Sequence, residues 1–299
     1  EPRKLGISHS CPAQANARRL AGVARGYEFG SAVGRGSGGV VYVVRDRRAG
    51  RVLAGKIMKH GSSGERRRAA REARIMKEAS DRCVCANVCR VERVFELAGR
   101  GARVVLLMEL CEGGDLLSRL QARGGRLGAA EGARAISMIA RGLRALHEGG
   151  ILHLDLKPEN CLYETAAADA TLKITDFGLA KHRDDDPAEA RAPPRIVGTL
   201  GYMAPEIVLQ RPATPAADVF SLGTVAFLLL SGTQAIALHG LSQREKLVRT
   251  LQCLVDFRPE AWAGVSPDAK VLCEMCRPGR EKGALLQRLL SRPCSARFG

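Results

Sequence analysis

The sequence predicts an α+β protein in which a small β-rich lobe precedes a larger helical lobe. Two observations predict this division. Between residues 27 and 110, short runs of β-branched and aliphatic residues alternate with turn signals, which is typical of strands. After Glu112-Gly113-Gly114, apolar residues recur at helical spacing instead. The chain has 299 residues, of which 45% are hydrophobic, so it can bury a substantial core.

Three strands and one helix are expected in the first lobe. The strands are Val40–Val44, Val52–Met58 and Val104–Met108, which are bounded by Gly and Arg. Glu65–Ala79 lacks Gly and Pro and is rich in helix formers, so it is expected to form one helix. Residues 1–26 show little pattern and are expected to be a flexible lead-in to a domain that covers residues 27–298.

Helices are expected to dominate the second lobe, from about residue 116 to 298. One apolar helical face consists of Ile136, Ile139, Ala140, Leu143 and Leu146. Short strands around Cys161–Tyr163 and Leu172–Ile174 bracket a loop, and helices are expected from Pro205 onward. Val219–Leu230 is the longest apolar stretch, but it is too short and too often interrupted by polar residues to span a bilayer. We expect it to be a buried helix.

The charge balance is strongly basic, with 47 Lys and Arg against 31 Asp and Glu and a net charge of +16. Such a balance can attract nucleic acid, acidic lipid or acidic proteins. The basic residues are scattered, however, with few aromatic residues among them, and no nucleic-acid module is recognisable. We therefore expect solvated surface charge and no nucleic-acid partner.

The ten cysteines form no disulfide framework. Cys83, Cys85 and Cys89 make one cluster, and Cys273 and Cys276 make another. A zinc site needs four ligands at suitable spacing, and no His lies beside either cluster. Reduced thiols in a cytoplasmic protein are the expected state, although the first residue is Glu rather than Met, so a targeting segment is not excluded.

The densest group of chemically useful side chains lies in His153-Leu-Asp-Leu-Lys-Pro-Glu-Asn160 and in Asp176-Phe-Gly178. Asp155 can accept a proton from an attacking hydroxyl group, and Lys157 can neutralise a phosphoryl group as it moves. Asn160 and Asp176 offer the oxygen ligands that Mg²⁺ prefers. This set of residues suits chemistry on a phosphate held by a divalent metal.

A second group of functional candidates lies in the first lobe. Residues 34–41 fit the pattern G-x-G-x-x-G-x-V, in which glycines let backbone N–H groups approach phosphate oxygens. A glycine-rich hairpin turn would look similar on its own. Lys56 lies in an apolar strand, where its charge is costly to bury without a partner, and Glu72 in the predicted helix is the candidate partner. Either residue alone would more often be an exposed surface charge.

Together these motifs resemble the eukaryotic protein kinase family. The catalytic loop of that family reads H-R-D-L-x-x-x-N and its metal-binding loop reads D-F-G. Gly198–Glu206 is similar to the family's G-T-x-x-Y-x-A-P-E segment. Asp218–Gly223 is similar to D-V-W-S-L-G, with Phe220 in place of Trp, and Arg297 resembles the late arginine that pairs with Glu206. The resemblance covers about residues 27–298 and implies the bilobal protein-kinase-like fold.

The resemblance implies a serine/threonine protein kinase that uses ATP and Mg²⁺. The catalytic residues would be Asp155 as base, with Lys157, Lys56, Glu72 and Thr199. The nucleotide would contact Gly34, Arg35, Gly36, Ser37, Gly38, Gly39, Val41, Ala54, Lys56, Met108, Glu109, Cys111, Asp115 and Glu159. Mg²⁺ would be held by Asn160 and Asp176.

Further roles follow from the same resemblance. Residues 109–115 would form the hinge between the lobes, where adenine bonds to backbone groups of Glu109 and Cys111. Thr199 would hydrogen-bond Asp155 and Lys157, and Asp218 would hold the catalytic loop in place. His147 and His153 are expected to be structural. Gly38 stands where the family often has an aromatic residue, which predicts a more mobile tip of the glycine-rich loop.

Within the family, the sequence resembles the calcium/calmodulin-dependent group, which includes myosin light chain and death-associated kinases. The form H-L-D-L-K-P-E-N and the segment from Phe257 through Trp262 to Lys270 carry this likeness. Whether calcium or calmodulin regulates the chain is not in the sequence. Glu159 and Asp115 predict a protein substrate with basic residues near the target hydroxyl. A monomeric domain is expected.

Two departures from the family pattern concern regulation. Leu154 replaces the Arg that binds a phosphorylated activation-loop residue, and residues 177–197 contain no Ser, Thr or Tyr. Activity is therefore expected not to depend on phosphorylation there. Arg68 could instead pair with Asp184-Asp-Asp186, although a solvated acidic turn is the alternative. A pseudokinase scaffold and a small-molecule phosphotransferase remain as competing functions. Lys56, Asp155 and Asp176, whose loss usually marks a pseudokinase, are all present.

Overall fold

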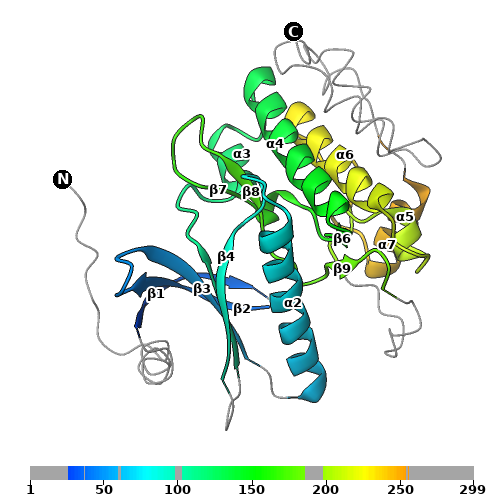
Figure 1. The fold of residues 1–299 in the computed structure, drawn as a ribbon. Helices are drawn as coiled ribbons and strands as arrows, with labels where there is room; N and C mark the ends of the chain where they lie inside the picture. The colour runs from blue at the N-terminus through cyan, green and yellow to red at the C-terminus, as the bar shows by residue number, and fades with distance from the viewer. Residues whose placement is uncertain are drawn as a thin grey trace. The chain divides into compact units, whose positions relative to one another are not determined.

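The computed structural model describes residues 26–36, 38–59, 62–97, 103–185, 198–253 and 255 (Figure 1). The chain divides into two compact units. The first comprises Glu1–Ala73 and Arg90–Leu110, and the second comprises Arg74–Cys89 and Cys111–Gly299. We call residues 177–197 the activation segment, and its residues 186–197 lie outside the described residues. So do Ser37, Phe257, Trp262, Cys273, Cys276 and Arg297.

The first unit contains a five-stranded antiparallel sheet with the strand order β1-β2-β3-β5-β4. The strands are β1 (Tyr27–Gly36), β2 (Gly39–Asp46), β3 (Val52–Lys59), β4 (Val91–Leu97) and β5 (Arg103–Glu109). The three strands expected from the sequence lie within β2, β3 and β5, so that prediction is confirmed.

A compact apolar cluster holds this sheet together. Its buried members are Tyr42, Val44, Leu53, Ile57, Val105 and Leu107. In β2 the buried residues near the strand's end alternate with more exposed ones, as expected when one face of a sheet is covered. Tyr27 packs edge-to-face on Phe95 at a ring distance of 5.7 Å, which joins the two outer strands β1 and β4 on one face.

Helix α2 (Ser63–Arg82) contains the predicted helix Glu65–Ala79 and extends beyond both of its ends. Its start is fixed by a reciprocal cap. The Glu65 N–H donates to Ser62 Oγ at 3.2 Å, and the Ser62 N–H donates to Glu65 Oε2 at 3.0 Å. The buried positions Ala69, Ala73 and Met76 recur every three or four residues and form its inner face.

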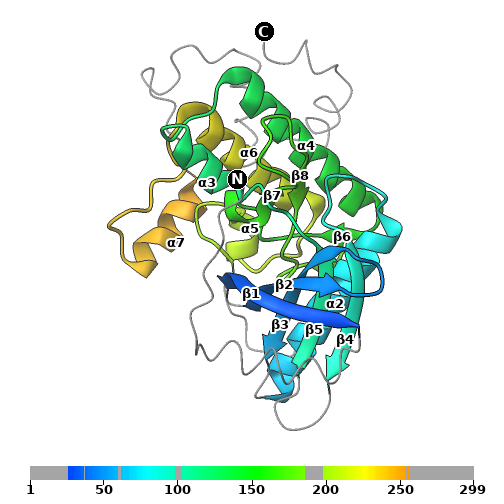
Figure 2. The ribbon, with the colours of Figure 1, turned by 90° about the vertical axis from the view of Figure 1, so that its left-hand side faces the viewer.

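The second unit is mainly helical. Its helices are α3 (Leu116–Ala122), α4 (Ala129–Glu148), the short 3₁₀ helix η1 (Pro158–Asn160), α5 (Pro205–Val208), α6 (Pro215–Ser231) and α7 (Gln243–Gln252). Helices α4 and α6 run side by side (Figures 1 and 2). A Cβ added to Gly132 in α4 would lie 3.0 Å from Leu230 of α6, so the glycine permits the close approach.

Helix α6 is buried along nearly its whole length, which confirms the expectation for residues 219–230. It ends at Gly232, whose φ of 76° is in the left-handed region and whose N–H donates to the Leu228 carbonyl. Among the residues that the structure describes, no helix combines the length and the apolar character needed to cross a membrane.

Two short strand pairs frame the loop that carries most of the chemistry. Strand β6 (Ile151–Leu152) pairs with β9 (Lys181–His182), and β7 (Cys161–Tyr163) pairs with β8 (Leu172–Ile174). The catalytic loop therefore leaves β6 and enters β7 through η1. The segment with Asp176 leaves β8 and enters β9, so both ends of each loop are fixed by backbone hydrogen bonds.

Candidate active site

Lys56 and Glu72 form a buried ion pair in the first unit. Lys56 Nζ lies 2.6 Å from Glu72 Oε1, and the two side chains are 10% and 7% exposed. Strand β3 and helix α2 supply one partner each, sixteen residues apart in sequence. Because the pair is charge-assisted and shielded from water, it fixes the position of the ammonium group far better than an exposed pair would.

The glycine-rich hairpin between β1 and β2 lies against this pair. Gly39 has a φ of 146°, and a Cβ there would lie 2.4 Å from the Ile57 carbonyl oxygen. A Cβ on Gly38 would lie 2.8 Å from Lys56 Nζ. A side chain at either position therefore requires movement, of the backbone for Gly39 and of the flexible lysine end for Gly38. Gly34 and Arg35 pair across the hairpin with Val41 and Val40, and Gly36 pairs with Gly39.

The predicted adenine-contacting residues of the first unit lie at the end of β5. Met108 is buried and pairs with Ala54 of β3. The N–H of Glu109 donates to the Arg90 carbonyl at 3.0 Å, and the Glu109 side chain accepts from the Arg90 N–H. Because this N–H already donates to Arg90, the backbone group of Glu109 that is left for the expected adenine contact is its carbonyl oxygen.

Asp115 begins helix α3 in the second unit and caps it. Its carboxylate accepts the Ser118 N–H at 2.8 Å and the Ser118 hydroxyl at 2.7 Å. A ribose contact was predicted for this side chain from the sequence, but its capping role was not, although an Asp directly before an apolar helical run is typical of a helix start. Cys111 is half-buried, and Glu159 is exposed at η1.

Asp155 lies at the centre of a hydrogen-bond network in the second unit. Its Oδ1 accepts the Thr199 hydroxyl at 3.1 Å, and its Oδ2 lies 3.2 Å from both Lys157 Nζ and Asn160 Nδ2. Lys157 Nζ also donates to Thr199 Oγ1 at 2.9 Å. The bonds expected of Thr199 are therefore present. Each carboxylate oxygen of Asp155 is oriented by a partner, while the side chain stays only partly buried.

Asp218 of helix α6 fixes the backbone at the start of the loop that carries Asp155. It is fully buried, and it accepts the His153 N–H at 2.9 Å, the Leu154 N–H at 2.8 Å and a bond from His147 Nε2 at 2.8 Å. Burial alone would raise the pKa of Asp218. The hydrogen bond and charge of His147, with the His153 N–H, outweigh burial and lower that pKa below its ordinary value.

The two histidines have structural positions, as the sequence argument expected. His153 is completely buried; its Nε2 bonds the Thr175 carbonyl at 3.0 Å and its Nδ1 accepts the Asp155 N–H. Its ring meets Phe177 edge-to-face at 5.1 Å. These contacts fix the loop from Asp155 relative to the segment that follows β8. The bond between His147 and Asp218 was not foreseen, because nothing in the sequence indicates which side chains meet across 71 residues.

Asn160 and Asp176 fit the role of magnesium ligands. The Asn160 Nδ2 group donates to the Asp155 carbonyl at 2.8 Å, so its Oδ1 is the end left to accept a cation. Asp176 is half-buried, and its φ of 61° lies in the left-handed region. In the described ranges no three His, Cys, Asp or Glu residues gather around one point. Two oxygen ligands are enough where substrate phosphates complete the coordination of Mg²⁺.

The activation segment makes an ion pair with helix α2 that was not predicted from the sequence. His182 Nε2 lies 3.0 Å from Glu78 Oε2, which connects β9 to the second half of helix α2 within the second unit. Asp184 is 88% exposed and pairs with Arg183 at 3.6 Å, which agrees with a solvated acidic turn. Asp186 is not described, and Arg68 belongs to the other unit. The pairing of Arg68 with this turn therefore stays a prediction.

Comparison with known proteins decides the family. Residues 27–284 match the family model for the protein kinase domain. The chain belongs to the protein kinase family. This kinase domain is therefore in a family whose members use ATP with Mg²⁺.

Its relatives include calcium-dependent protein kinase 22 of Oryza sativa subsp. japonica, which is 34% identical over 286 residues, 93% of this chain and 48% of that protein. The calcium and calcium/calmodulin-dependent serine/threonine-protein kinase of Lilium longiflorum is 40% identical over 187 residues, 62% of this chain and 34% of that protein. Serine/threonine-protein kinase H1 of Homo sapiens is 34% identical over 248 residues, 82% of this chain and 55% of that protein. The kinase domain thus spans about a third to just over half of the length of these relatives.

Proposed function

We propose that this chain is a serine/threonine protein kinase domain, which transfers the γ-phosphoryl group of ATP to Ser or Thr hydroxyls of proteins. The network of Asp155, Lys157 and Thr199 carries the proposal. It holds a carboxylate that can accept a proton beside a cation, and hydrogen bonds within the chain position both groups. The serine/threonine kinase names of the relatives support the same acceptor class.

In the proposed reaction, the hydroxyl oxygen of the substrate bonds to the γ-phosphorus of ATP while the bond from that phosphorus to the bridging oxygen of the leaving ADP breaks, and Asp155 accepts the proton of the hydroxyl. Lys157, 3.2 Å from that carboxylate, holds it in position and offsets negative charge on the phosphoryl group as it moves. Lys56, oriented by Glu72, neutralises phosphate charge of the nucleotide. Asn160 and Asp176 would hold Mg²⁺, which when bound spreads the negative charge of the phosphates. Thr199 keeps the base and the lysine at a fixed separation.

The test is turnover by the full chain with Asp155→Asn. This variant should lower kcat by about 10²- to 10⁴-fold, because the amide cannot accept the proton. Its melting temperature should stay within about 2 °C of wild type, since Asn preserves the shape of the side chain. The matched control is Asp81→Asn, which removes a half-exposed acid from helix α2 and should leave turnover unchanged.

Equal turnover by wild type and Asp155→Asn would show that the measured activity does not come from this site, and the pseudokinase scaffold would then replace the proposal. The same assay with metabolite hydroxyls in place of peptides separates a small-molecule phosphotransferase. Transfer to metabolites alone would exclude the protein substrate.

We further propose a preference for Arg or Lys near the target hydroxyl. The exposed carboxylate of Glu159, the middle residue of η1, supports this preference, since no cation is found paired with it among the described residues. A peptide array in which basic and neutral peptides are phosphorylated equally would contradict this preference. Calcium or calmodulin dependence, which the names of the relatives suggest, is tested by adding each to the same assay.

A further inference from the structure

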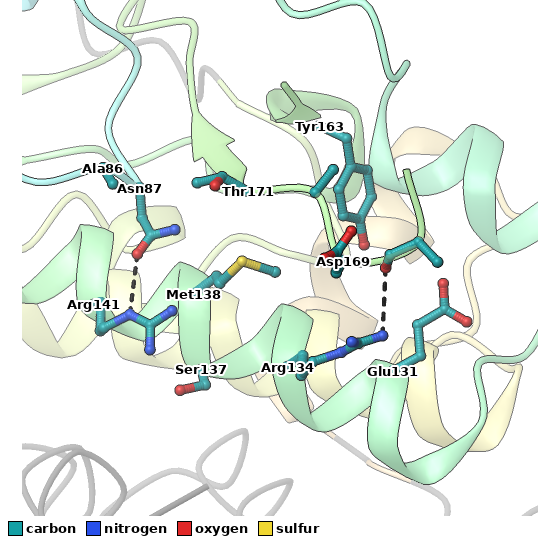
Figure 3. Close-up of a pocket in the computed structure, with 12 residues that line it drawn as sticks. Ala86, Asn87, Glu131, Arg134, Ser137, Met138, Arg141, Tyr163, Asp169 and Thr171 are labelled. Carbon is teal, nitrogen blue, oxygen red and sulfur yellow. Dashed lines mark hydrogen bonds between the residues drawn. The ribbon is translucent and has the colours of Figure 1, made fainter. Parts of the chain in front are cut away.

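A pocket of about 500 Å³ lies in the second unit, and none of the residues assigned to catalysis or nucleotide binding lines it (Figure 3). One wall is helix α4. The other walls are the loop between β7 and β8 and the short stretch Ala86-Asn87. Its volume is in the range of pockets that bind small ligands or a few residues of a peptide.

Two arginines with an apolar residue between them line the helical wall. Arg134, Met138 and Arg141 are spaced by four and three residues, so they lie along one face of α4. Seven residues of helix separate the arginine Cα atoms by about 10.5 Å along the axis. Both arginines are exposed, and Met138 is half-buried between them.

Each guanidinium group is held in position by a hydrogen bond to a neighbouring loop. Arg141 Nε donates to Asn87 Oδ1 at 3.1 Å, and Asn87, only 4% exposed, donates in turn to the Leu172 carbonyl. Arg134 Nη2 donates to the Ala168 carbonyl at 3.4 Å. One nitrogen of each group is thus engaged. In the described part of the chain no acid lies within ion-pair distance of either arginine, so their other nitrogens can receive an anion.

The pocket also contains two acids, which determine the sign of its charge. Glu131 Oε2 pairs with Arg123 at 3.5 Å, which offsets part of its charge, while Glu131 Oε1 is buried with no hydrogen-bond partner in the described part of the chain. Asp169 is exposed on the β7–β8 loop, and no ion pair joins it to another described residue. Two arginines therefore face one uncompensated carboxylate, and the net charge of +16 adds a longer-range attraction for acidic proteins.

We propose that this pocket binds an extended acidic segment of a partner protein, with the pattern acidic–x–apolar–x–acidic. In an extended chain, side chains at alternate positions point the same way, and positions i and i+4 lie about 13.5 Å apart. That span exceeds the separation of the two arginine Cα atoms by about 3 Å, and the side chains of the two acidic residues can make up the difference. The apolar residue at i+2 then lies over Met138. The proposal is independent of the catalytic function.

Fluorescence anisotropy with the full chain tests this directly. The probe is a labelled peptide Gly-Ser-Glu-Ala-Leu-Ala-Glu-Gly-Ser, and binding should be saturable and should weaken as salt is raised. Two control peptides, one with Lys for both Glu residues and one with both Glu residues adjacent, should bind at least about tenfold more weakly. Absence of saturation up to about 1 mM would overturn the proposal.

Variants on the two sides of the pocket should act in opposite directions. Arg134→Gln and Arg141→Gln should each weaken binding by about three- to tenfold, because each removes one charge-assisted contact. Asp169→Asn should tighten it by about two- to fivefold, because it removes a like charge. The matched control is Arg144→Gln, an arginine of the same helix that pairs with Glu148 and does not line the pocket. It should change nothing.

The direction in which each variant changes the affinity distinguishes an acidic segment from other molecules that could occupy the pocket. Weaker binding with Asp169→Asn would mean that the pocket prefers a basic segment, and an equal effect of Arg144→Gln would mean non-specific attraction. Either result overturns the proposal. Concentration-dependent dimers in sedimentation that dissociate in Arg141→Gln would assign the pocket to a second copy of this chain, which also overturns it. Melting temperatures of all variants verify that they are folded.

Discussion

Leu154 and Asp176 share an unusual backbone conformation; Leu154 precedes the candidate base Asp155, and Asp176 is a candidate magnesium ligand. Their φ angles are 63° and 61°, in the left-handed region that costs a residue with a Cβ about 1–2 kcal/mol. The Leu154 N–H is held by Asp218, which gives the strained turn a fixed anchor. Strain of this kind persists only where surrounding contacts determine it, and such positions cluster at functional sites.

Asp218 should therefore control both stability and the shape of the loop. Asp218→Asn should lower the free energy of unfolding near neutral pH by about 3 kcal/mol, because it removes a buried charge that accepts three bonds. It should also lower kcat. The exposed Asp184→Asn is the matched control, and urea titration is the measurement. A variant as stable as the control would show that the bonds to Asp218 do not hold the loop.

The pH dependence of the same variant gives a sharper result. The pKa of Asp218 is lowered on folding, so its stabilisation is complete above the unfolded value of 3.8 and is lost as pH falls through the lower folded value. The difference in unfolding free energy between wild type and Asp218→Asn should therefore be constant from about pH 7 to pH 5 and should shrink below pH 4. Urea titrations at pH 7, 5 and 3.5 check this. A constant difference down to pH 3.5 would contradict it.

Gly39 gives a prediction about the glycine-rich hairpin. Gly39→Ala should destabilise the fold by about 3 kcal/mol or more, because a Cβ would meet the Ile57 carbonyl at 2.4 Å on a backbone with φ 146°. Gly50→Ala also carries a positive φ, 68°, but no atom lies within 4 Å of its Cβ. It should cost only about 1 kcal/mol. Equal shifts in the two thermal unfolding curves would show that the close approach has no effect.

At the scale of elements, β3 and α2 are coupled by the Lys56–Glu72 pair. Glu72→Gln keeps a hydrogen-bond acceptor but leaves the buried ammonium group without its counter-charge. We expect kcat/KM for ATP to fall by about 10- to 100-fold with a small loss of stability. Glu96→Gln, which removes an exposed pair with Arg66, should leave kcat/KM unchanged. Similar kinetic losses in both variants would remove the special role of the buried pair.

The sequence predicted some elements well because their signals are local. The strands β2, β3 and β5, the helix α2 and the buried helix α6 each follow from a run of residues or a period. The family motifs likewise brought Asp155, Lys157 and Thr199 together correctly, although Thr199 is 44 residues from Asp155. A motif records a spatial arrangement that spacing alone does not contain.

Several contacts and the pocket beside α4 could be found only from the three-dimensional structure. The bond from His147 to Asp218 and the pair of His182 with Glu78 join positions 71 and 104 residues apart, and each residue type is common on protein surfaces. The pocket beside α4 depends on where the β7–β8 loop folds back, which no pattern in Glu164–Thr171 predicts. Asp115 shows a different limit, since one carboxylate suits both a helix cap and a ribose contact.

At the scale of the whole molecule, the chain lacks the arginine before Asp155 that would bind a phosphate, and residues 177–197 contain no Ser, Thr or Tyr to phosphorylate. Leu154 occupies the position of the usual arginine, and its backbone N–H donates to Asp218. After the segment that carries Asp176, strand β9 contacts helix α2 through His182 and Glu78. This contact needs no phosphorylated side chain. These contacts form from the chain's own residues, without a modification.

The chain should therefore be fully active without phosphorylation. Protein as purified should have the same kcat, within about twofold, before and after phosphatase treatment, with mass spectrometry to verify that the treated protein carries no phosphate. His182→Ala should lower kcat, because it removes the contact that takes the place of a phosphate, whereas His239→Ala changes a histidine outside this network and should not. A fall of tenfold or more on phosphatase treatment would contradict the prediction. Such a fall would place the switch at Thr199 or beyond the segment, because residues 177–197 offer no hydroxyl to modify.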